Sequence, residues 1–224
     1  ELFDNKFFIV SPAEAAVMAP EQRLNLEVGY EALRMSGAGK KSLMNSYTAF
    51  YSGNSEYDWI HFDRPVGSSA SAGAAQHTSI SSARLAFCLG CRGPALTVDA
   101  GFAGGLVAVY MGMTSMCDVQ VHEKAQLACC MAPHLALLPK HAIDAWQSGH
   151  WSMQGRCQTF DAAASGYVRS EGASALACRS RFESVDGERV EDESLRQAAL
   201  GSLCGKGLAH SGATASLGSP SGPA

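Results

Sequence analysis

The sequence predicts an α/β fold organised around one strand–turn–helix unit at residues 93–116. Residues 95–98 form a short apolar and β-branched run after Gly93 and Pro94, which is typical of a strand buried on both faces. Residues 106–116 are apolar on most sides, as in a helix inside a core. The small residues between the two runs allow a sharp elbow, because larger side chains there would collide with neighbouring backbone.

Local signals predict the elements that precede this elbow. Residues 1–18 predict a loop with apolar anchors. A helix is predicted from Pro20, with proline near its first position and an acidic residue in its first turn, up to Gly37. Residues 47–52 predict a short strand that ends in a turn, and residues 77–89 predict a second helix.

The segments that follow the elbow helix show several different sequence patterns. Residues 119–126 predict a loop that is either solvated or a partner surface, and a strand-like run resumes at residues 127–131. Residues 173–178 alternate small and larger side chains, which predicts another strand. Residues 181–193 are charged and rich in turn formers, and residues 194–204 fit a short helix and a strand about equally well.

Composition favours one domain with a sizeable core, since 46% of the 224 residues are hydrophobic. A formal net charge of -4 gives no electrostatic reason to expect nucleic acid as a partner. No apolar run reaches the roughly 20 residues of a membrane span. The eight cysteines lack the spacing of a disulfide framework, which favours a reducing intracellular compartment, the cytoplasm or a plastid. We interpret the chain as a possible piece of a longer protein, because it begins at Glu1 without a methionine.

A Cys-x-x-Cys pattern at Cys88 and Cys91 raises the question of a zinc or redox site. Such a site needs two more ligands, and Cys129, Cys130 and His134 are available by residue type. Adjacent cysteines rarely both bind one ion, so core packing by small sulfur side chains is the favoured interpretation. We therefore expect no metal.

Two long motifs and one short one resemble the β-ketoacyl synthases of polyketide and fatty-acid synthases. Residues 98–108, Val-Asp-Ala-Gly-Phe-Ala-Gly-Gly-Leu-Val-Ala, resemble the family's active-site elbow, Val-Asp-Thr-Ala-Cys-Ser-Ser-Ser-Leu-Val-Ala. Residues 155–172 resemble its Gly-Arg-Cys-Lys-x-Phe-Asp-x-x-Ala-Asp-Gly-Tyr-Val-Arg-Gly-Glu-Gly, and residues 18–23, Met-Ala-Pro-Glu-Gln-Arg, resemble its Met-Asp-Pro-Gln-Gln-Arg. The resemblance covers only the amino-terminal half of a ketosynthase. It implies one ketosynthase-like domain over residues 1–224, half of a thiolase-like fold, with a βαβαβ order, a mixed sheet and a buried helix after the elbow strand.

The resemblance places Phe102 where the family has the cysteine that carries the acyl chain. A phenyl ring has no lone pair with which to attack a thioester, so no catalytic residue is expected at this position. Phe102 is instead expected to be buried and to plug the mouth of the acyl tunnel. The expected elbow residues are Asp99, Gly101, Phe102, Ala103 and Gly104.

A second group of expected site residues belongs to the motif at residues 155–172. Asp161, Arg169 and Glu171 are expected to brace the loop beneath the elbow rather than to transfer protons. The family's two catalytic histidines come from its second half. None of the seven histidines here is followed by the Gly-Thr-Gly that marks the first of them, so a general base and an enolate-stabilising donor are both missing from this sequence.

These losses favour a catalytically inactive ketosynthase-like protein that serves as a structural or interaction subunit of a larger assembly. An apolar face, left where the second half would pack, would then need a protein partner. Two alternatives stay open. One is the amino-terminal part of a longer synthase with acyltransferase or decarboxylase activity, and the other is a module that binds an acyl group or an acyl carrier protein without turnover. No cofactor is expected, and the resemblance implies dimerisation next to the elbow strand.

Overall fold

The computed structural model describes residues 3–55, 58–62, 74, 77–117, 124–185, 188–193 and 199–209. The chain forms two compact units, Glu1–Ser180 and Arg181–Ala224. Three stretches with sequence-based expectations, residues 119–123, 194–198 and 211–224, lie outside the described residues. That one ketosynthase-like domain spans the whole chain stays a prediction.

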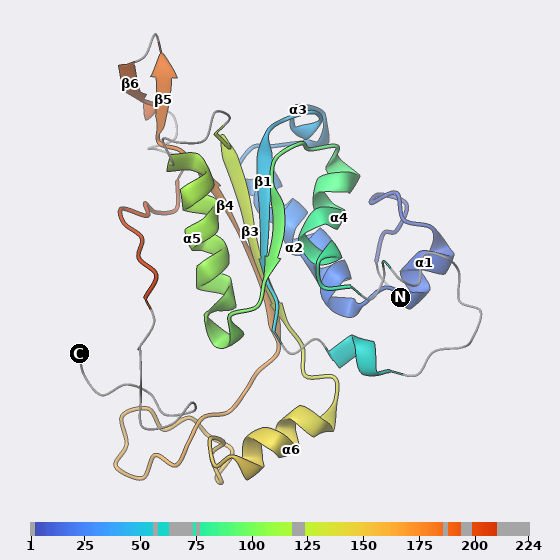
Figure 1. Cartoon of the computed structure of the whole chain (residues 1–224), viewed down its shortest axis with the longest axis vertical. Coiled ribbons are helices and arrows are strands. Elements are labelled where there is room, and N and C mark those ends of the chain that lie inside the picture. The colour runs from blue at the N-terminus through green and yellow to red at the C-terminus, as the bar shows by residue number, and fades with distance from the viewer. Residues whose placement is uncertain are drawn as a thin grey trace. The chain divides into compact units, whose positions relative to one another are not determined.

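The first unit is built on a four-stranded mixed sheet with the strand order β2-β1-β3-β4 (Figure 1). β1 (Thr48–Gly53) runs parallel to both β2 (Ala95–Val98) and β3 (Leu127–His134), and β4 (Gly172–Arg179) is antiparallel to β3. The α/β class and the mixed sheet expected from the sequence are therefore confirmed. β2 differs from expectation in one respect, because it is an edge strand and its Leu96 is 48% exposed.

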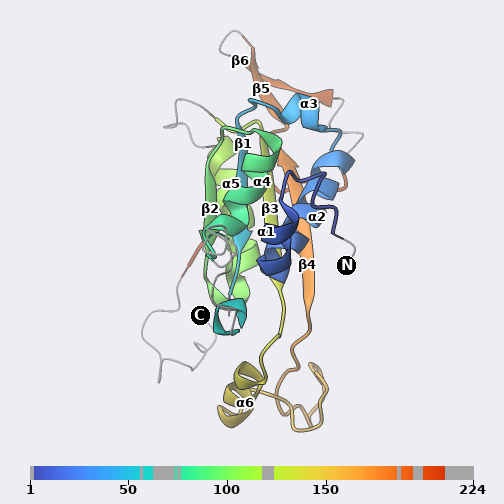
Figure 2. The ribbon, with the colours of Figure 1, turned by 90° about the vertical axis from the view of Figure 1, so that its right-hand side faces the viewer.

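Helices cover both faces of this sheet (Figures 1 and 2). α2 (Pro20–Met35) and α4 (Ile80–Leu89) pack on one face, and α5 (Gly104–Cys117) packs on the other. Side chains of β1 alternate between the two layers, so Phe50 joins the core under α2 and α4 while Tyr51 joins the core under α5. All six residues of β1 are buried, as expected for a central strand with helices on both sides.

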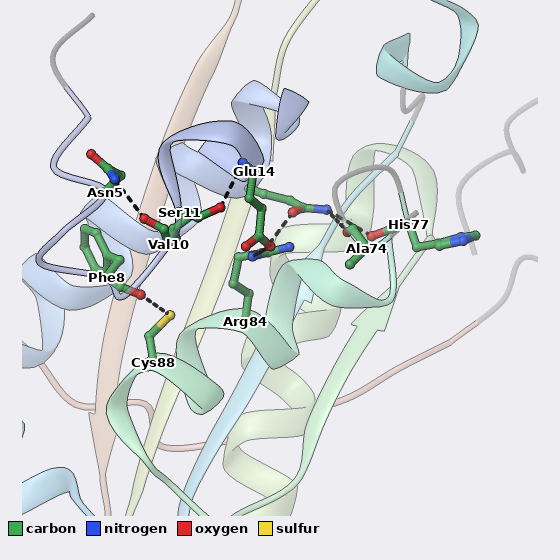
Figure 3. Close-up of polar contacts among 10 residues, drawn as sticks. Asn5, Phe8, Val10, Ser11, Glu14, Ala74, His77, Arg84 and Cys88 are labelled. Atoms are coloured by element: carbon green, nitrogen blue, oxygen red, sulfur yellow. Dashed lines mark hydrogen bonds and ion pairs between the residues drawn. The ribbon is translucent and has the colours of Figure 1, made fainter. Parts of the chain in front are cut away.

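The amino-terminal segment contains a short helix, α1 (Pro12–Val17), where the sequence predicts only a loop. The Ser11 side chain accepts a hydrogen bond from the Glu14 amide, and Pro12 occupies the first helical position, so two start signals act together. α1 is tied to α4 by the Arg84 guanidinium, whose Nη1 lies 2.6 Å from Glu14 Oε1 (Figure 3). Arg84 Nε also donates to Gln22 Oε1 at 3.1 Å, which links α4 to α2.

α5 is buried along only one stripe, although the sequence predicts burial on most sides. Gly104, Ala108, Gly112 and Met116 recur every four residues and face the sheet. Leu106 lies off this stripe and is 78% exposed. The difference arises because a single sheet covers a single side of the helix, and the described chain places no second layer over the other.

The remaining described elements are short: α3 (Lys40–Leu43), η1 (Asp58–His61), η3 (Gly101–Ala103), α6 (Pro139–Gln147), β5 (Phe182–Val185) and β6 (Glu188–Glu191). β5 and β6 form an antiparallel pair in the second unit, within the stretch predicted only as charged and turn-rich. Arg181 Nε donates to Glu191 Oε1 at 2.6 Å beside this pair. No helix in the described part of the chain has the length and apolar character needed to cross a membrane.

Candidate functional site

The elbow between β2 and α5 is the geometric centre of the candidate site. β2 ends at Val98, and the Asp99 carboxylate then accepts a hydrogen bond from the Gly101 amide at 3.1 Å. Gly101 has a φ of 53°, a left-handed conformation that glycine adopts without a steric penalty. Phe102 and Ala103 complete the single turn of η3, after which α5 begins. The structure thus places Phe102 two residues before Gly104, the first residue of α5.

A glycine at position 53 allows the elbow to lie against the end of β1. A Cβ atom on Gly53 would come within 2.2 Å of the Gly104 carbonyl carbon and 2.6 Å of the Gly105 nitrogen. Non-bonded heavy atoms do not come this close to a Cβ, so only glycine at position 53 permits this approach. The carboxyl end of β1 and the first turn of α5 are therefore packed backbone against backbone.

Phe102 is 74% exposed and does not plug a tunnel, which corrects the expectation of a buried ring. Its ring makes an edge-to-face contact with Tyr167 at a centroid distance of 5.7 Å. The Arg169 guanidinium carbon lies 4.9 Å from the centre of the same ring. These two contacts leave most of the ring open, because no helix or strand of the described chain packs over it.

A hollow of about 260 Å³ lies beside the Phe102 ring. It is lined by Phe102, His134, Tyr167, Val168, Arg169 and Ser170. His134 is the last residue of β3, and β3 is parallel to β1, so the carboxyl ends of both strands meet the elbow at one edge of the sheet. The sequence indicated His134 only as an available metal ligand and did not single out Tyr167.

Backbone pairing closes the loop that carries Tyr167 to the hollow. Trp151 and Tyr167 form an isolated parallel bridge, in which the Ser152 amide donates to the Tyr167 carbonyl at 3.0 Å and the Tyr167 amide donates to the His150 carbonyl at 3.1 Å. A Cβ on Gly166 would lie 2.5 Å from the His150 carbonyl oxygen, and Gly166 has a φ of 139°. Glycine at position 166 thus permits this closure.

The two acidic residues expected to brace the loop contact backbone amides. Asp161 Oδ1 accepts a hydrogen bond from the Ala163 amide at 2.8 Å. Glu171 Oε1 accepts one from the Ala136 amide at 2.9 Å and so links the start of β4 to the segment after β3. Arg169 faces the Phe102 ring instead. The bracing role of Asp161, Arg169 and Glu171 stays a prediction.

Among the described residues, no thiol lines the hollow. The Cys157 thiol accepts a hydrogen bond at 3.1 Å from the amide of Val168, a residue that lines the hollow. On the α5 face of the sheet, a hydrogen bond from the Cys130 thiol lowers the pKa of Cys178 below the ordinary value of a thiol. Burial raises the pKa of Cys88 to about 11, and its thiol donates to the Phe8 carbonyl in the core.

These environments predict a large difference in thiol reactivity. We expect iodoacetamide at pH 8 to modify exposed Cys157 roughly a hundredfold faster than Cys88, because about a thousandth of a thiol with that pKa is ionised at this pH. Peptide mass mapping of the native protein over time measures both rates. Similar rates at the two positions would contradict the buried placement of Cys88.

Comparisons with known proteins converge on one family. Residues 1–181 match the family model described as "Beta-ketoacyl synthase, N-terminal domain". The chain is 34% identical over 227 residues to a phenolphthiocerol/phthiocerol polyketide synthase protein of Mycobacterium tuberculosis, and the match covers 99% of this chain and 10% of that protein. It is 32% identical over 224 residues to the erythronolide synthase EryA3 of Saccharopolyspora erythraea, with 99% of this chain and 7% of the relative covered.

A solved structure shows the same likeness in three dimensions. The ketosynthase from module 6 of the bacillaene synthase of Bacillus subtilis 168 superimposes with a TM-score of 0.68 at 25% sequence identity. The match covers 80% of this chain and 30% of that ketosynthase. The chain thus spans about a tenth of the length of its curated relatives and less than a third of a solved ketosynthase.

Proposed function

Because the chain belongs to the β-ketoacyl synthase family through its amino-terminal domain, we propose that it is a catalytically inactive, ketosynthase-like subunit of a larger protein assembly. One observation supports the proposal: Phe102 lies in η3, two residues before α5 begins, and the motif resemblance aligns this residue with the family's cysteine. The correspondence with that motif rests on the flanking Val98, Asp99 and Leu106, which are shared with the family.

The chemistry of acyl transfer explains why this residue matters. A ketosynthase nucleophile attacks the thioester carbonyl, forms a new thioester and expels the carrier thiol. The Phe102 ring offers no atom for that attack. His134 and Arg169 remain beside the ring and can orient or attract a ligand, but neither replaces a thiolate at the helix start. The site is therefore suited to binding a ligand or a protein partner rather than to catalysing acyl transfer.

Exposed apolar surface supports a role in an assembly. α5 contains no charged residue, and its outward Leu106 lies one turn from the exposed Phe102 ring. Leu96 of the edge strand β2 is also partly open. Large exposed apolar side chains such as these favour a surface that a protein partner covers. The curated relatives are themselves polyketide synthases of which this chain matches one small part, which is consistent with protein partners.

Two other functions remain candidates, each with an observation in its favour. The hollow combines apolar walls from Phe102 and Tyr167 with the charge of Arg169, which favours binding of an acyl chain or an acyl carrier protein without turnover. The length of the relatives favours the amino-terminal part of a longer synthase. The intact mass of the native polypeptide distinguishes the longer synthase from the other two functions. A native chain that continues into a His-Gly-Thr-Gly motif would carry the family's histidines.

Self-acylation tests the proposal directly. Incubation with acyl thioesters such as acetyl and malonyl coenzyme A is expected to leave the intact mass of the wild-type protein unchanged, because position 102 has no nucleophile. The Cys157→Ser variant is the control for adventitious labelling of the exposed thiol near the hollow. A gain of one acyl group that persists in this variant, and that peptide mapping places on a side chain of the hollow rather than on exposed Cys117 or Cys204, would contradict an inactive elbow. Saturable binding of the thioester without a mass gain would favour the binding module instead.

A further inference from the structure

Two cysteine side chains lie beside each other on the α5 face of the sheet. Cys130 is in β3 and Cys178 is in β4, and these strands are antiparallel neighbours. Cys130 lies opposite Leu176, and Cys178 lies opposite Ala128, so the two cysteines occupy diagonal positions two residues apart in the pairing. Side chains at such positions point to the same face of a sheet and are near enough to interact.

Packing around the two thiols confirms that they share one layer. Cys130 belongs to the buried cluster under α5, and Cys178 packs against that cluster. The adjacent Cys129 belongs to the other layer, under α2 and α4. A Cβ on Gly112 would lie 2.6 Å from Cys130 Sγ, so this thiol packs directly against the backbone of α5. The hydrogen bond between the thiols of Cys130 and Cys178 completes the pair.

The two thiols differ in their access to solvent. Cys130 is 3% exposed, whereas Cys178 is partly exposed on the outer strand of the described sheet. Leu176, the preceding residue of β4 on the same face, is 53% exposed, so the sheet is open beside Cys178. Donation of the shared hydrogen bond raises the pKa of the Cys130 thiol, and burial raises it further. A small oxidant therefore reaches Cys178 first, and Cys178 is the thiol that ionises more readily.

We propose that Cys178 and Cys130 form a peroxide-reactive dithiol site, in which the outer thiol is oxidised first and the buried thiol then closes a disulfide between β3 and β4. The Cys178 thiolate attacks one oxygen of hydrogen peroxide and breaks the O–O bond, and the departing hydroxide takes up the proton that this thiol released. The Cys130 sulfur then attacks the resulting sulfenic sulfur, and the hydroxyl group leaves with the Cys130 proton. Two thiols and one hydrogen peroxide thus give one disulfide and two waters.

The place of β4 in the sheet makes this closure possible. The Cα atoms of a disulfide are usually within about 7 Å of each other, and diagonal partners on antiparallel strands lie roughly at this limit. In the described sheet β4 is paired on one side only, so a small shift toward β3 breaks no pairing on its other side.

Oxidation at this site would bear on the candidate site without depending on it. The disulfide would close residues 131–177 into one covalent loop, which includes His134, Tyr167 and Arg169 of the hollow. The reaction needs only the two thiols and a peroxide. It is therefore independent of whether the hollow binds an acyl group, and the inference goes beyond the proposed function.

Peptide mapping after treatment with hydrogen peroxide tests the dithiol site. The treated protein is blocked with N-ethylmaleimide under denaturing conditions and digested with trypsin without a reductant. The peptides 125–140 and 170–179 are expected to appear as one linked species, with a disulfide between Cys130 and Cys178 and N-ethylmaleimide on Cys129. Dithiothreitol is expected to restore the two separate peptides, since disulfide formation is reversible by thiol exchange.

The two adjacent cysteines of β3 provide matched variants. Both are made in a background in which the exposed cysteines are serine, so that these cannot exchange. Cys129→Ala is expected to keep the linked peptide, because Cys129 faces the other layer, and Cys130→Ala is expected to abolish it. In Cys130→Ala, dimedone is expected to trap a sulfenic acid at Cys178, because the thiol that would resolve it is missing. The exposed cysteines are Cys117, Cys157 and Cys204.

Two outcomes would overturn the dithiol site. The first is the absence of the linked peptide from the wild-type protein at a peroxide dose that oxidises the exposed Cys157, a result that needs no variant to fold. The second is a linked peptide in which fragmentation places the disulfide on Cys129 instead of Cys130. Neither outcome bears on self-acylation at the elbow, so the two proposals fail separately.

Discussion

Replacing Gly53 with alanine is expected to lower the free energy of unfolding by about 3 kcal/mol. The new methyl group would sit 2.2 Å from the Gly104 carbonyl carbon and 2.3 Å from its oxygen. These neighbours are backbone atoms at the start of α5, so no side chain can change rotamer to make room. The elbow would have to move away from β1, and the packing of α5 on the sheet would be lost in part.

Urea denaturation followed by circular dichroism measures this loss. Gly172→Ala is the matched control, because a Cβ at that position meets nothing within 4 Å and Gly172 lies in the regular strand β4. We expect this control to stay within about 0.5 kcal/mol of the wild-type protein. If both variants were equally stable, the backbone contact between β1 and the elbow would not exist as described.

Replacing Arg84 with methionine is expected to cost about 3 kcal/mol. Arg84 is 9% exposed, and its guanidinium holds the Glu14 carboxylate and the Gln22 amide oxygen at once (Figure 3). Methionine preserves much of the apolar stem but leaves both acceptors without this donor. Since the Glu14 side chain is 20% exposed, water offsets part of the penalty, which keeps the expected cost at the lower end for a broken buried pair.

The Arg92→Met variant provides the comparison for Arg84. Arg92 is exposed and donates to Asn45 Oδ1 at 3.0 Å, so its replacement is expected to change stability by no more than about 0.5 kcal/mol. Equal urea midpoints for the two variants would show that the contact between α1, α2 and α4 contributes little. A double-mutant cycle with Glu14→Gln then measures the coupling between the two charged groups.

Local sequence signals predicted the elements at the centre of the fold. β2 has the bounds expected from its apolar run, and α4 and α5 lie where periodicity and small residues placed helices. These elements are set by side chains close together in the sequence. α1 was missed because six residues are too few for a periodic pattern, although Ser11 and Pro12 carried its start signal.

The sequence did not predict which side chains are exposed or which distant residues meet at the hollow. The sequence indicates that α5 is apolar but not which of its sides the sheet covers, so the openness of Phe102 and Leu106 was missed. His134 and Tyr167 come to the hollow from different segments, and no local pattern joins them to the elbow. The acidic residue in the first turn of α2, Glu21, has the signature of a solvated helix start, whereas the structure buries it.

The exposure of the Phe102 ring has an evolutionary consequence. Codons for phenylalanine and cysteine differ by a single base, and a ring that is largely in contact with solvent contributes little to folding. An exchange between the two residues is thus one mutational step that the scaffold tolerates in either direction. A change from phenylalanine to cysteine would remove the ring's contacts with Tyr167 and Arg169.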